Sequence, residues 1–333
     1  MANPVIAQVT RGTRVESIHR GAFAVVDGDG KIVVSRGDVE AFAFPRSSLK
    51  LMQALPLVES GAADAYGFGN RDLAMACASH SSSLIHVETA SNMLKAANLS
   101  ESDLQCGAHW PVFSVDEAVG MAQRGETPTR LHNNCSGKHS GFLCTCAHMG
   151  VSTHDYIDPD NELQRGLRAI VADLCGSAIA DSECGLDGCS APTFAVPIQS
   201  MAHAHARLVT GRALGAGRAK AAQRLMHACM AEPQMIADHG RYCTRLMLAA
   251  PGRVFAKTGA EGFYIAALPT HGWGVALKCD DGATRGAEVA IASILAGLLG
   301  EADPAHPALN AMARQTVRDW NGNDVGEVRA VSG

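Results

Sequence analysis

The rest of the sequence is arranged around the stretch Ala41-Phe-Ala-Phe-Pro-Arg-Ser-Ser-Leu-Lys-Leu-Met-Gln53. Its apolar run stops at Pro45, and an amphipathic helix is predicted to begin at Ser47, because a serine shortly after a proline is typical of a helix start. Ser47 and Lys50 then lie three residues apart on one helical face. The stretch therefore predicts a hydroxyl beside an amine at the beginning of a helix.

Strand patterns flank this stretch at both ends of the chain. Over residues 1–45, Val-rich runs alternate with turn signals, and Gly28-Asp-Gly30 between two such runs predicts a hairpin. After Pro251 the pattern returns as short apolar runs separated by Gly or Pro. These later strands are expected at 254–257, 262–268 and 273–279.

Helical spacing dominates between the two ends. The expected helices are 47–61, 70–78, 84–97, 115–124, 142–149, 162–175 and 219–231, with a further buried helix at 288–299. We therefore predict an α/β fold of the α+β type, in which the N- and C-terminal strands form one antiparallel sheet and a helical middle packs on its face. Since no segment resembles a linker, residues 1–333 are predicted to be a single catalytic domain. Residues 1–45 and 250–333 would be its sheet-forming ends, and residues 46–249 its mainly helical middle.

The composition excludes several classes of partner. A net charge of −5 arises from 28 basic and 33 acidic residues mixed along the chain, which argues against nucleic acid and acidic membranes. The N-terminus lacks a secretory signal pattern, and the longest apolar stretch, 289–299, is too short to span a bilayer, so a cytoplasmic location is expected. Eleven cysteines, an odd number, then indicate reduced and mostly buried thiols.

Lysine is scarce, with only seven among the 28 basic residues, so its positions are informative. Chance alone gives roughly 0.5 Ser-x-x-Lys matches, and Ser47 with Lys50 also fits a capped helix with a solvated lysine. Lys257-Thr-Gly259 at the end of a predicted strand is a stronger signal, because chance gives roughly 0.03 such triplets. The two motifs in this order are typical of serine β-lactamases and penicillin-binding proteins. There, a second lysine helps to keep the first amine neutral, so that it can accept a hydroxyl proton.

Two other segments carry reactive side chains. Ser79 follows an apolar helix in a serine cluster, and it either reaches the same pocket or belongs to a polar turn. Cys, His and Lys residues lie in the Gly-rich segments 134–139 and 184–189, whose spacing fits no common zinc finger, so they form either a metal site or inert buried thiols. Asp187 either caps a turn or holds the α-amino group of a substrate.

Taken together, these motifs resemble the rhizobial-type, or class 3, L-asparaginases. The segments that carry the resemblance are Val15-Glu-Ser-Ile-His-Arg-Gly21, Phe44-Pro-Arg-Ser-Ser-Leu-Lys-Leu-Met-Gln53, Cys77-Ala-Ser-His80, Asn133-Asn-Cys-Ser-Gly-Lys-His-Ser-Gly141, Gly185-Leu-Asp-Gly-Cys-Ser-Ala-Pro192 and Ala256-Lys-Thr-Gly-Ala-Glu-Gly262. The resemblance implies a serine β-lactamase-like fold, a homodimer, and hydrolysis of L-asparagine to L-aspartate and ammonia.

The resemblance also implies roles for individual residues. It implies two Ser-Lys tandems, one formed by Ser47 with Lys50 and the other by Ser79 with Lys257. The implied zinc ligands are Cys135, Lys138 and Cys189. The implied substrate-binding residue is Asp187, with Arg46 and His80 around the pocket.

The chemical hypothesis is acyl transfer. Ser47 attacks the side-chain amide carbon, Lys50 takes its proton, ammonia leaves, and water hydrolyses the resulting ester. Ser79 and Lys257 would relay the proton, and the sequence leaves open which of the two serines is the nucleophile. Because Ser-Lys chemistry needs no metal hydroxide, the zinc would position loops and Asp187.

Other functions also fit these motifs. On the same fold, the chain could be a glutaminase, a β-lactamase or a peptidase, although a cytoplasmic protein would not meet periplasmic peptidoglycan. A non-catalytic, zinc-stabilised binding protein is the alternative from another class. The presence of both Lys50 and Lys257 argues against it, since a pocket without catalytic work has no use for two crowded lysines.

Overall fold

The computed structural model describes residues 2–331, and the chain forms two compact units. The first unit comprises Met1–Ser48, Val196–Thr210 and Arg245–Gly333, and the second comprises Leu49–Ala195 and Gly211–Thr244. Each unit is described by itself below. That the whole chain acts as one catalytic domain stays a prediction. Among residues 2–331, no helix has both the length and the apolar character needed to cross a bilayer.

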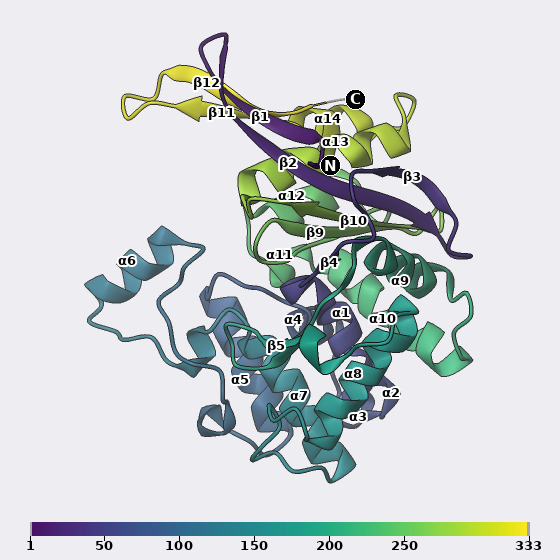
Figure 1. Ribbon diagram of the computed structural model, residues 1–333. Helices are drawn as coiled ribbons and strands as arrows, with labels where there is room; N and C mark the ends of the chain where they lie inside the picture. The colour runs from purple at the N-terminus through teal and green to yellow at the C-terminus, as the bar shows by residue number, and fades with distance from the viewer. Residues whose placement is uncertain (1, 332–333) are drawn as a thin grey trace. The chain divides into compact units, whose positions relative to one another are not determined.

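The first unit is built on an eight-stranded antiparallel sheet (Figure 1). Its strands are β1 (Val5–Arg11), β2 (Arg14–Asp27), β3 (Ile32–Arg36), β8 (Phe255–Thr258), β9 (Phe263–Leu268), β10 (Trp273–Cys279), β11 (Arg314–Arg318) and β12 (Asp324–Ala330). They follow the order β11-β12-β1-β2-β10-β9-β8, and β3 pairs with β2 outside this path. The prediction that strands from both ends of the chain form one antiparallel sheet is therefore confirmed, whereas the hairpin β11–β12 was not predicted.

The long strand β2 joins the two parts of this sheet. Its first half pairs with β1, and its second half pairs with β10 and β3. The predicted hairpin lies between β2 and β3. There the Asp27 carboxylate accepts hydrogen bonds from the backbone N–H groups of Asp29 and Lys31, and Gly30 adopts a φ of +86° that favours glycine.

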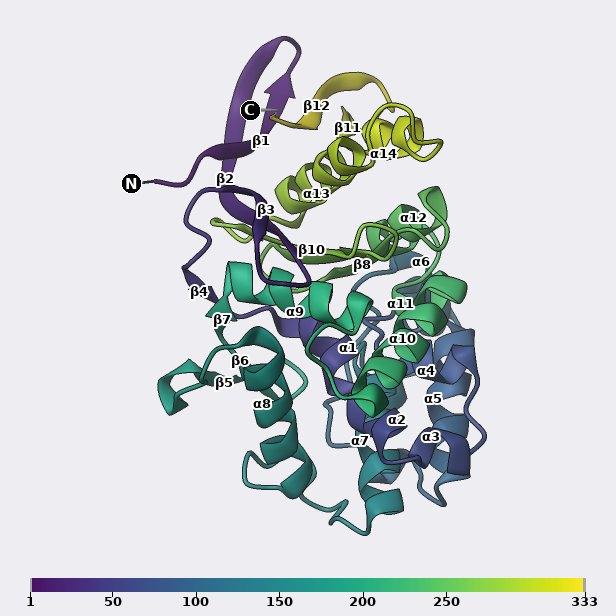
Figure 2. The same ribbon diagram turned by 90° about the vertical axis from the view of Figure 1, so that its right-hand side faces the viewer.

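Two helices cover opposite sides of the sheet, α9 (Ile198–Thr210) on one side and α13 (Thr284–Leu299) on the other (Figure 2). Gly274 in β10 lets α9 approach closely, because a Cβ there would clash with the carbonyl oxygen of Ala202. The predicted helix at 288–299 corresponds to α13. The helix α9 was not predicted, although its buried Ile198, Met201, His205 and Leu208 have helical spacing. The smaller elements of this unit are β4 (Phe42–Ala43), β7 (Val196–Pro197) and α14 (His306–Met312).

The second unit is mainly helical, which confirms the prediction of a helical middle region. Its helices are α1 (Lys50–Gln53), α2 (Leu55–Glu59), α3 (Ala62–Ala65), α4 (Asn70–Ala76), α5 (Leu84–Ala96), α6 (Val115–Gln123), α7 (Ser136–Met149), α8 (Glu162–Cys175), α10 (Ala216–Ala231) and α11 (Pro233–Ile236). Three 3₁₀ turns, η2 (Glu101–Asp103), η3 (Arg130–His132) and η4 (Asp181–Glu183), and a short hairpin of β5 (Cys184–Leu186) and β6 (Pro192–Phe194) complete it. The helix α12 (Tyr242–Ala249) crosses the sequence boundary between the units.

Two predicted helices differ from the structure. The segment 47–61 is divided into the 3₁₀ turn η1 (Arg46–Leu49), α1 and α2, because Pro56 supplies no N–H and starts a new helix. The N-cap of α1 is Leu49, without a side-chain cap, so Ser47 does not cap a helix as expected. The helix expected from 142 begins at Ser136, which places Lys138 in its first turn.

His205 in α9 should make the stability of the protein depend on pH. Its Nδ1–H donates to the carbonyl of Met201 at 2.9 Å, and burial lowers its pKa to about 4 from an ordinary value near 6.5. Between these values the unfolded chain binds a proton that the folded chain does not, so the free energy of unfolding falls as the pH falls. The full effect is about 3 kcal/mol at most. In urea titrations at pH 7.5 and 5, His205→Leu should lose less stability on acidification than wild type. Equal losses in both proteins would contradict this assignment.

Candidate active site

The turn that carries Ser47 has a strained backbone. Arg46, directly before it, has a φ of +52°, a left-handed conformation that is uncommon for residues other than glycine. Such strain is found preferentially at functional sites. Ser47 is half-buried, and its neighbour Ser48 is fully buried. The chain therefore makes a sharp, strained turn immediately before the predicted nucleophile.

The strand that carries Lys257 lies against this turn within the first unit. The Ser48 hydroxyl donates to the backbone carbonyl of Lys257 at 3.2 Å. A Cβ on Gly259 would clash with the carbonyl oxygen of Pro45, so only glycine permits this approach of strand β8 to the turn. Lys257 is only 1% exposed, and its Nζ donates to the Thr258 carbonyl at 2.9 Å. The backbone of the Lys-Thr-Gly motif thus packs against the segment around Ser47.

Lys50 is fully buried. It belongs to the second unit, because the boundary between the units falls between Ser48 and Leu49. Its Nζ lies 2.9 Å from the hydroxyl of Ser79 and 3.1 Å from the sulfur of Cys135, and it also donates to the carbonyl of Ala78. The structure therefore brings Ser79 directly to Lys50. Since Ser79 and Lys257 belong to different units, their pairing stays a prediction.

Backbone contacts within the second unit hold the segment around Ser79 in place. The N–H of Ser79 donates to the Ile236 carbonyl at 2.8 Å, and the hydroxyl of Ser81 donates to the Ala237 carbonyl at 2.9 Å. These residues follow α4, and all of the serines from 79 to 82 are buried. The serine cluster is therefore a rigid segment of the interior and not a solvated turn.

His80 is fully buried and uses both ring nitrogens. Its Nδ1 accepts the backbone N–H of Ser82 at 3.1 Å, so its Nε2 carries the proton and donates to the Ser136 hydroxyl at 2.9 Å. Burial holds the pKa of His80 well below its usual value, and the neighbouring His86 and Lys50 lower it further. A neutral His80 therefore fixes the positions of the surrounding hydroxyls, and its predicted contact with substrate stays a prediction.

The three predicted metal ligands converge in the interior of the second unit. Cys135 precedes α7, Lys138 lies in its first turn, and Cys189 lies in the turn between β5 and β6; their exposed fractions are 4%, 2% and 3%. The Lys138 Nζ lies 3.0 Å from the Cys189 sulfur. At Gly137 a Cβ would clash with the carbonyl oxygen of Met75, so glycine allows the start of α7 to pack against the end of α4.

Protons and charges link these three side chains. A hydrogen bond from Cys135 lowers the pKa of the Cys189 thiol to about 5 against the effect of burial, and the Lys138 charge lowers it further. The same hydrogen bond, together with burial, raises the pKa of Cys135. Burial opposes the charge on Lys138, but the two sulfurs and Asp187 outweigh it and raise its pKa. Two convergent sulfurs with one nitrogen are a donor set that suits zinc, provided that Cys135 and Lys138 lose their protons.

Asp187 lies close to this cluster, in the same turn as Cys189. Its backbone N–H donates to the Ala191 carbonyl at 2.9 Å, and its carboxylate accepts the N–H of Gly188 at 2.7 Å. The carboxylate is half-buried and near enough to Lys138 to raise its pKa. The turn therefore fixes the carboxylate beside the predicted metal ligands.

Two further residues near the cluster were not singled out as ligands from the sequence. Cys106 is buried, and burial followed by the repulsion of Cys135 and Cys189 raises the pKa of its thiol to about 12. His139 Nδ1 is hydrogen-bonded to the Tyr156 hydroxyl at 2.7 Å, while its buried Nε2 has no hydrogen-bond partner. Cys106 lies in a segment without a motif, so only the tertiary structure reveals its position.

A buried Ser-Lys pair that lies beside a cluster of thiols and an amine is suited to hydrolytic chemistry. The model of the L-asparaginase II family matches residues 7–330, and the chain belongs to this family. It is therefore an L-asparaginase-type hydrolase. No curated protein matches its sequence.

Two solved structures are similar in part. A β-lactamase from Mycobacterium bovis has 12% identity and a TM-score of 0.40, covering 80% of this chain and 89% of that chain. A structure from Bacteroides dorei, provisionally assigned as a β-lactamase, has 12% identity and a TM-score of 0.43, covering 79% of this chain and 87% of that chain. Likenesses this distant do not define an activity.

Proposed function

We propose that the protein is an L-asparaginase that hydrolyses the side-chain amide of L-asparagine to L-aspartate and ammonia through a Ser-Lys acyl-enzyme. The contact between the fully buried Lys50 amine and the Ser79 hydroxyl, at 2.9 Å, supports this proposal most directly. A lysine that is enclosed in this way and bonded to a serine can exchange a proton with it. Membership of the L-asparaginase II family supports an amino acid amide as substrate.

The proposed reaction has two stages. Ser47 attacks the side-chain amide carbon while Lys50 accepts the hydroxyl proton, and the C–N bond breaks as that proton passes to the departing ammonia. Water then attacks the ester and L-aspartate leaves. The Ser47 oxygen regains a proton from that water. Ser79 relays protons through its hydrogen bond to Lys50, and Lys257 provides a second amine. Backbone N–H groups near Ser47 or after Lys257 stabilise the oxyanion.

The substrate would be held by groups around this chemistry. Asp187 would bind the α-amino group through its half-buried carboxylate. Arg46 and His80 would line the pocket, His80 through the hydroxyls that it positions. A homodimer and a cytoplasmic location remain predictions.

We further propose zinc binding by Cys135, Lys138 and Cys189. Bound zinc would supply a fixed positive charge and an anchor for the surrounding loops. The chain's own contribution is to fix the turn that carries Asp187, because Cys189 lies two residues after it. The buried convergence of the two sulfurs and the amine supports this assignment.

The activity is tested by ammonia release from L-asparagine and L-glutamine, with a chromogenic β-lactam as a third substrate. L-Asparagine should be hydrolysed with a kcat/KM at least tenfold above that of L-glutamine, and the β-lactam should not be turned over. A preference for L-glutamine would identify a glutaminase, and β-lactam hydrolysis would identify a β-lactamase-like enzyme. Binding of L-asparagine without ammonia release would favour the non-catalytic protein.

Alanine variants at the two serines distinguish the nucleophile. Ser47→Ala should reduce kcat for L-asparagine to less than about a thousandth of wild type, because the attacking oxygen is lost. Ser79→Ala should be slower than wild type but measurably active, because it removes only the relay partner of Lys50. Ser48→Ala is the matched control, since its hydroxyl donates to the backbone carbonyl of Lys257, and it should stay active. Residual activity of Ser47→Ala above that level would favour Ser79 as the nucleophile.

Removal of zinc should affect substrate binding more than chemistry. After treatment with a chelator, kcat for L-asparagine should be retained while KM rises at least tenfold, because the turn that carries Asp187 loses its anchor. Added Zn²⁺ should restore the original KM. Loss of kcat with an unchanged KM would show that the metal takes part in the chemical step.

A further inference from the structure

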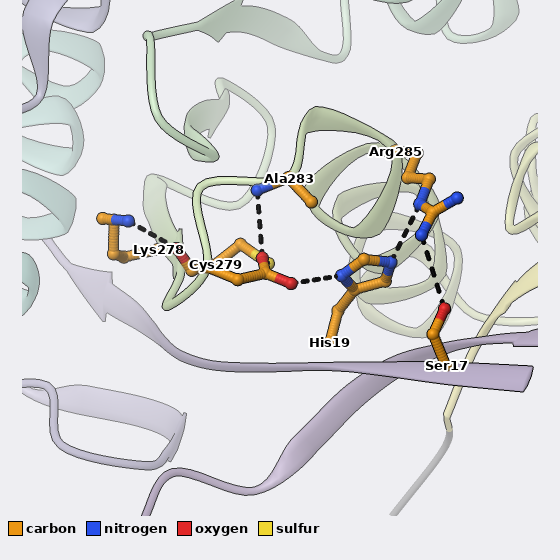
Figure 3. Close-up of polar contacts among 7 residues, drawn as sticks. Ser17, His19, Lys278, Cys279, Ala283 and Arg285 are labelled. Carbon is orange, nitrogen blue, oxygen red and sulfur yellow. Dashed lines mark hydrogen bonds and ion pairs between the residues drawn. The ribbon is translucent and has the colours of Figure 1, made fainter.

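A second group of potential metal ligands lies in the first unit and shares no residue with the proposed active site (Figure 3). His19 belongs to β2, Cys279 ends β10, and Asp281 lies in the turn before α13. One donor atom from each residue lies within 4.8 Å of those of the other two. His19 and Cys279 are buried, whereas Asp281 is exposed, so the group is open to solvent on one side.

The sheet register and one glycine bring these side chains together. Cys279 pairs with Gly21 in β2, two residues after His19, so His19 and Cys279 lie towards the same face of the sheet. On that face, a Cβ on Gly286 of α13 would lie 2.7 Å from the His19 ring, so glycine makes room for the imidazole. The cluster is therefore formed by the packing of α13 on the sheet.

When no metal is bound, hydrogen bonds connect the donor atoms of this group. The Asp281 carboxylate accepts from the Cys279 thiol at 3.0 Å and from the backbone N–H of Ala283 at 3.0 Å. Arg285 Nε donates to His19 Nε2 at 3.1 Å, so Nδ1 carries the ring proton and donates to Asp281 at 2.6 Å. Burial, followed by the hydrogen bond to Asp281, raises the pKa of Cys279 to about 12, which keeps the thiol protonated.

We propose that His19 Nδ1, the Cys279 thiolate and an Asp281 oxygen form a zinc site with a fourth position open to water. Sulfur, imidazole nitrogen and carboxylate oxygen are the three donor types that zinc prefers. Tetrahedral zinc separates such donors by about 3.3 to 3.7 Å. His19 Nδ1 and the Cys279 sulfur lie 2.6 Å and 3.0 Å from the Asp281 oxygens, so each of these two pairs needs to open by less than about 1 Å. Binding releases the Cys279 proton to solvent and moves the His19 ring proton from Nδ1 to Nε2.

Arg285 competes with this metal. Once His19 Nε2 carries the proton, it faces another N–H donor on Arg285, and two donors repel each other. Arg285 is exposed, and its other side-chain contact is a 3.4 Å hydrogen bond from Nη2 to the Ser17 hydroxyl, so it can turn towards solvent. Arg285 therefore weakens zinc binding at this site. The nearby Lys278 amine donates to backbone carbonyls, those of Glu261 at 2.7 Å and of Cys279, and does not contact the thiol.

The site is tested by zinc content per chain, measured after full-length protein has been stripped with a chelator, reloaded with Zn²⁺ and desalted. Asp281→Asn should bind one zinc fewer than wild type, and so should Cys279→Ser. The Asp281 variant is the safer of the two, because its side chain is exposed and folding should be retained. Cys175→Ser, at a buried thiol outside both groups, is the matched control and should keep the wild-type content.

Affinity and spectroscopy separate this site from that of Cys135, Lys138 and Cys189. Arg285→Met should bind zinc at the second site at least tenfold more tightly. In a Cys189→Ser background, Co²⁺ should still give a sulfur-to-metal charge-transfer band, and adding Cys279→Ser should abolish it. Asp281→Asn should hydrolyse L-asparagine like wild type. The zinc site of His19, Cys279 and Asp281 would therefore stand even if the protein proved not to be an asparaginase. Unchanged zinc content in Asp281→Asn, or no effect of Arg285→Met on affinity, would overturn the proposal.

Discussion

An ammonium group buried in a protein destabilises the fold by several kcal/mol unless acceptors surround it. The chain nevertheless buries Lys50, Lys138 and Lys257, at 0%, 2% and 1% exposure. Each amine has a hydrogen-bond acceptor within its own unit. The acceptor is the Ser79 hydroxyl for Lys50, the Cys189 sulfur for Lys138 and the Thr258 carbonyl for Lys257. The serine cluster, the start of α7 and the end of β8 are therefore tied to the positions of three amines.

Glycine residues allow the backbone segments that carry these amines to pack closely against their neighbours. At Gly137 the start of α7 meets the end of α4, and at Gly259 the end of β8 meets the turn around Ser47. In both cases the opposing atom is a backbone carbonyl, which cannot move aside as a flexible side chain could. A methyl group at either position would therefore separate the elements that carry the reactive side chains, although neither glycine performs chemistry.

In both proposed zinc groups, hydrogen bonds between the side chains take the place of the metal when none is bound. Hydrogen bonds join the donors when no metal is bound, between Cys135 and Cys189 in one group and between Cys279 and Asp281 in the other. They differ in their exposure and in their competing cation. The first group is enclosed and includes its own amine, Lys138, whereas the second opens to solvent beside the exposed guanidinium of Arg285. Zinc at the second site would thus respond more readily to the surrounding metal concentration.

The strand-rich ends, the helical middle and the reactive residue types could be predicted from the sequence, because periodicity and short motifs are local properties of the chain. Which of these groups meet became clear only from the fold. It showed that Lys50 contacts Ser79 and Cys135, that Cys106 lies near the thiol cluster, and that His19 joins residues about 260 positions later in the chain. Such contacts depend on strand register and on close backbone approach at glycines, and both bring together segments that lie far apart in the sequence. The helix α9 was missed although its buried residues have helical spacing; it lies within the middle of the sequence but packs on the sheet of the first unit.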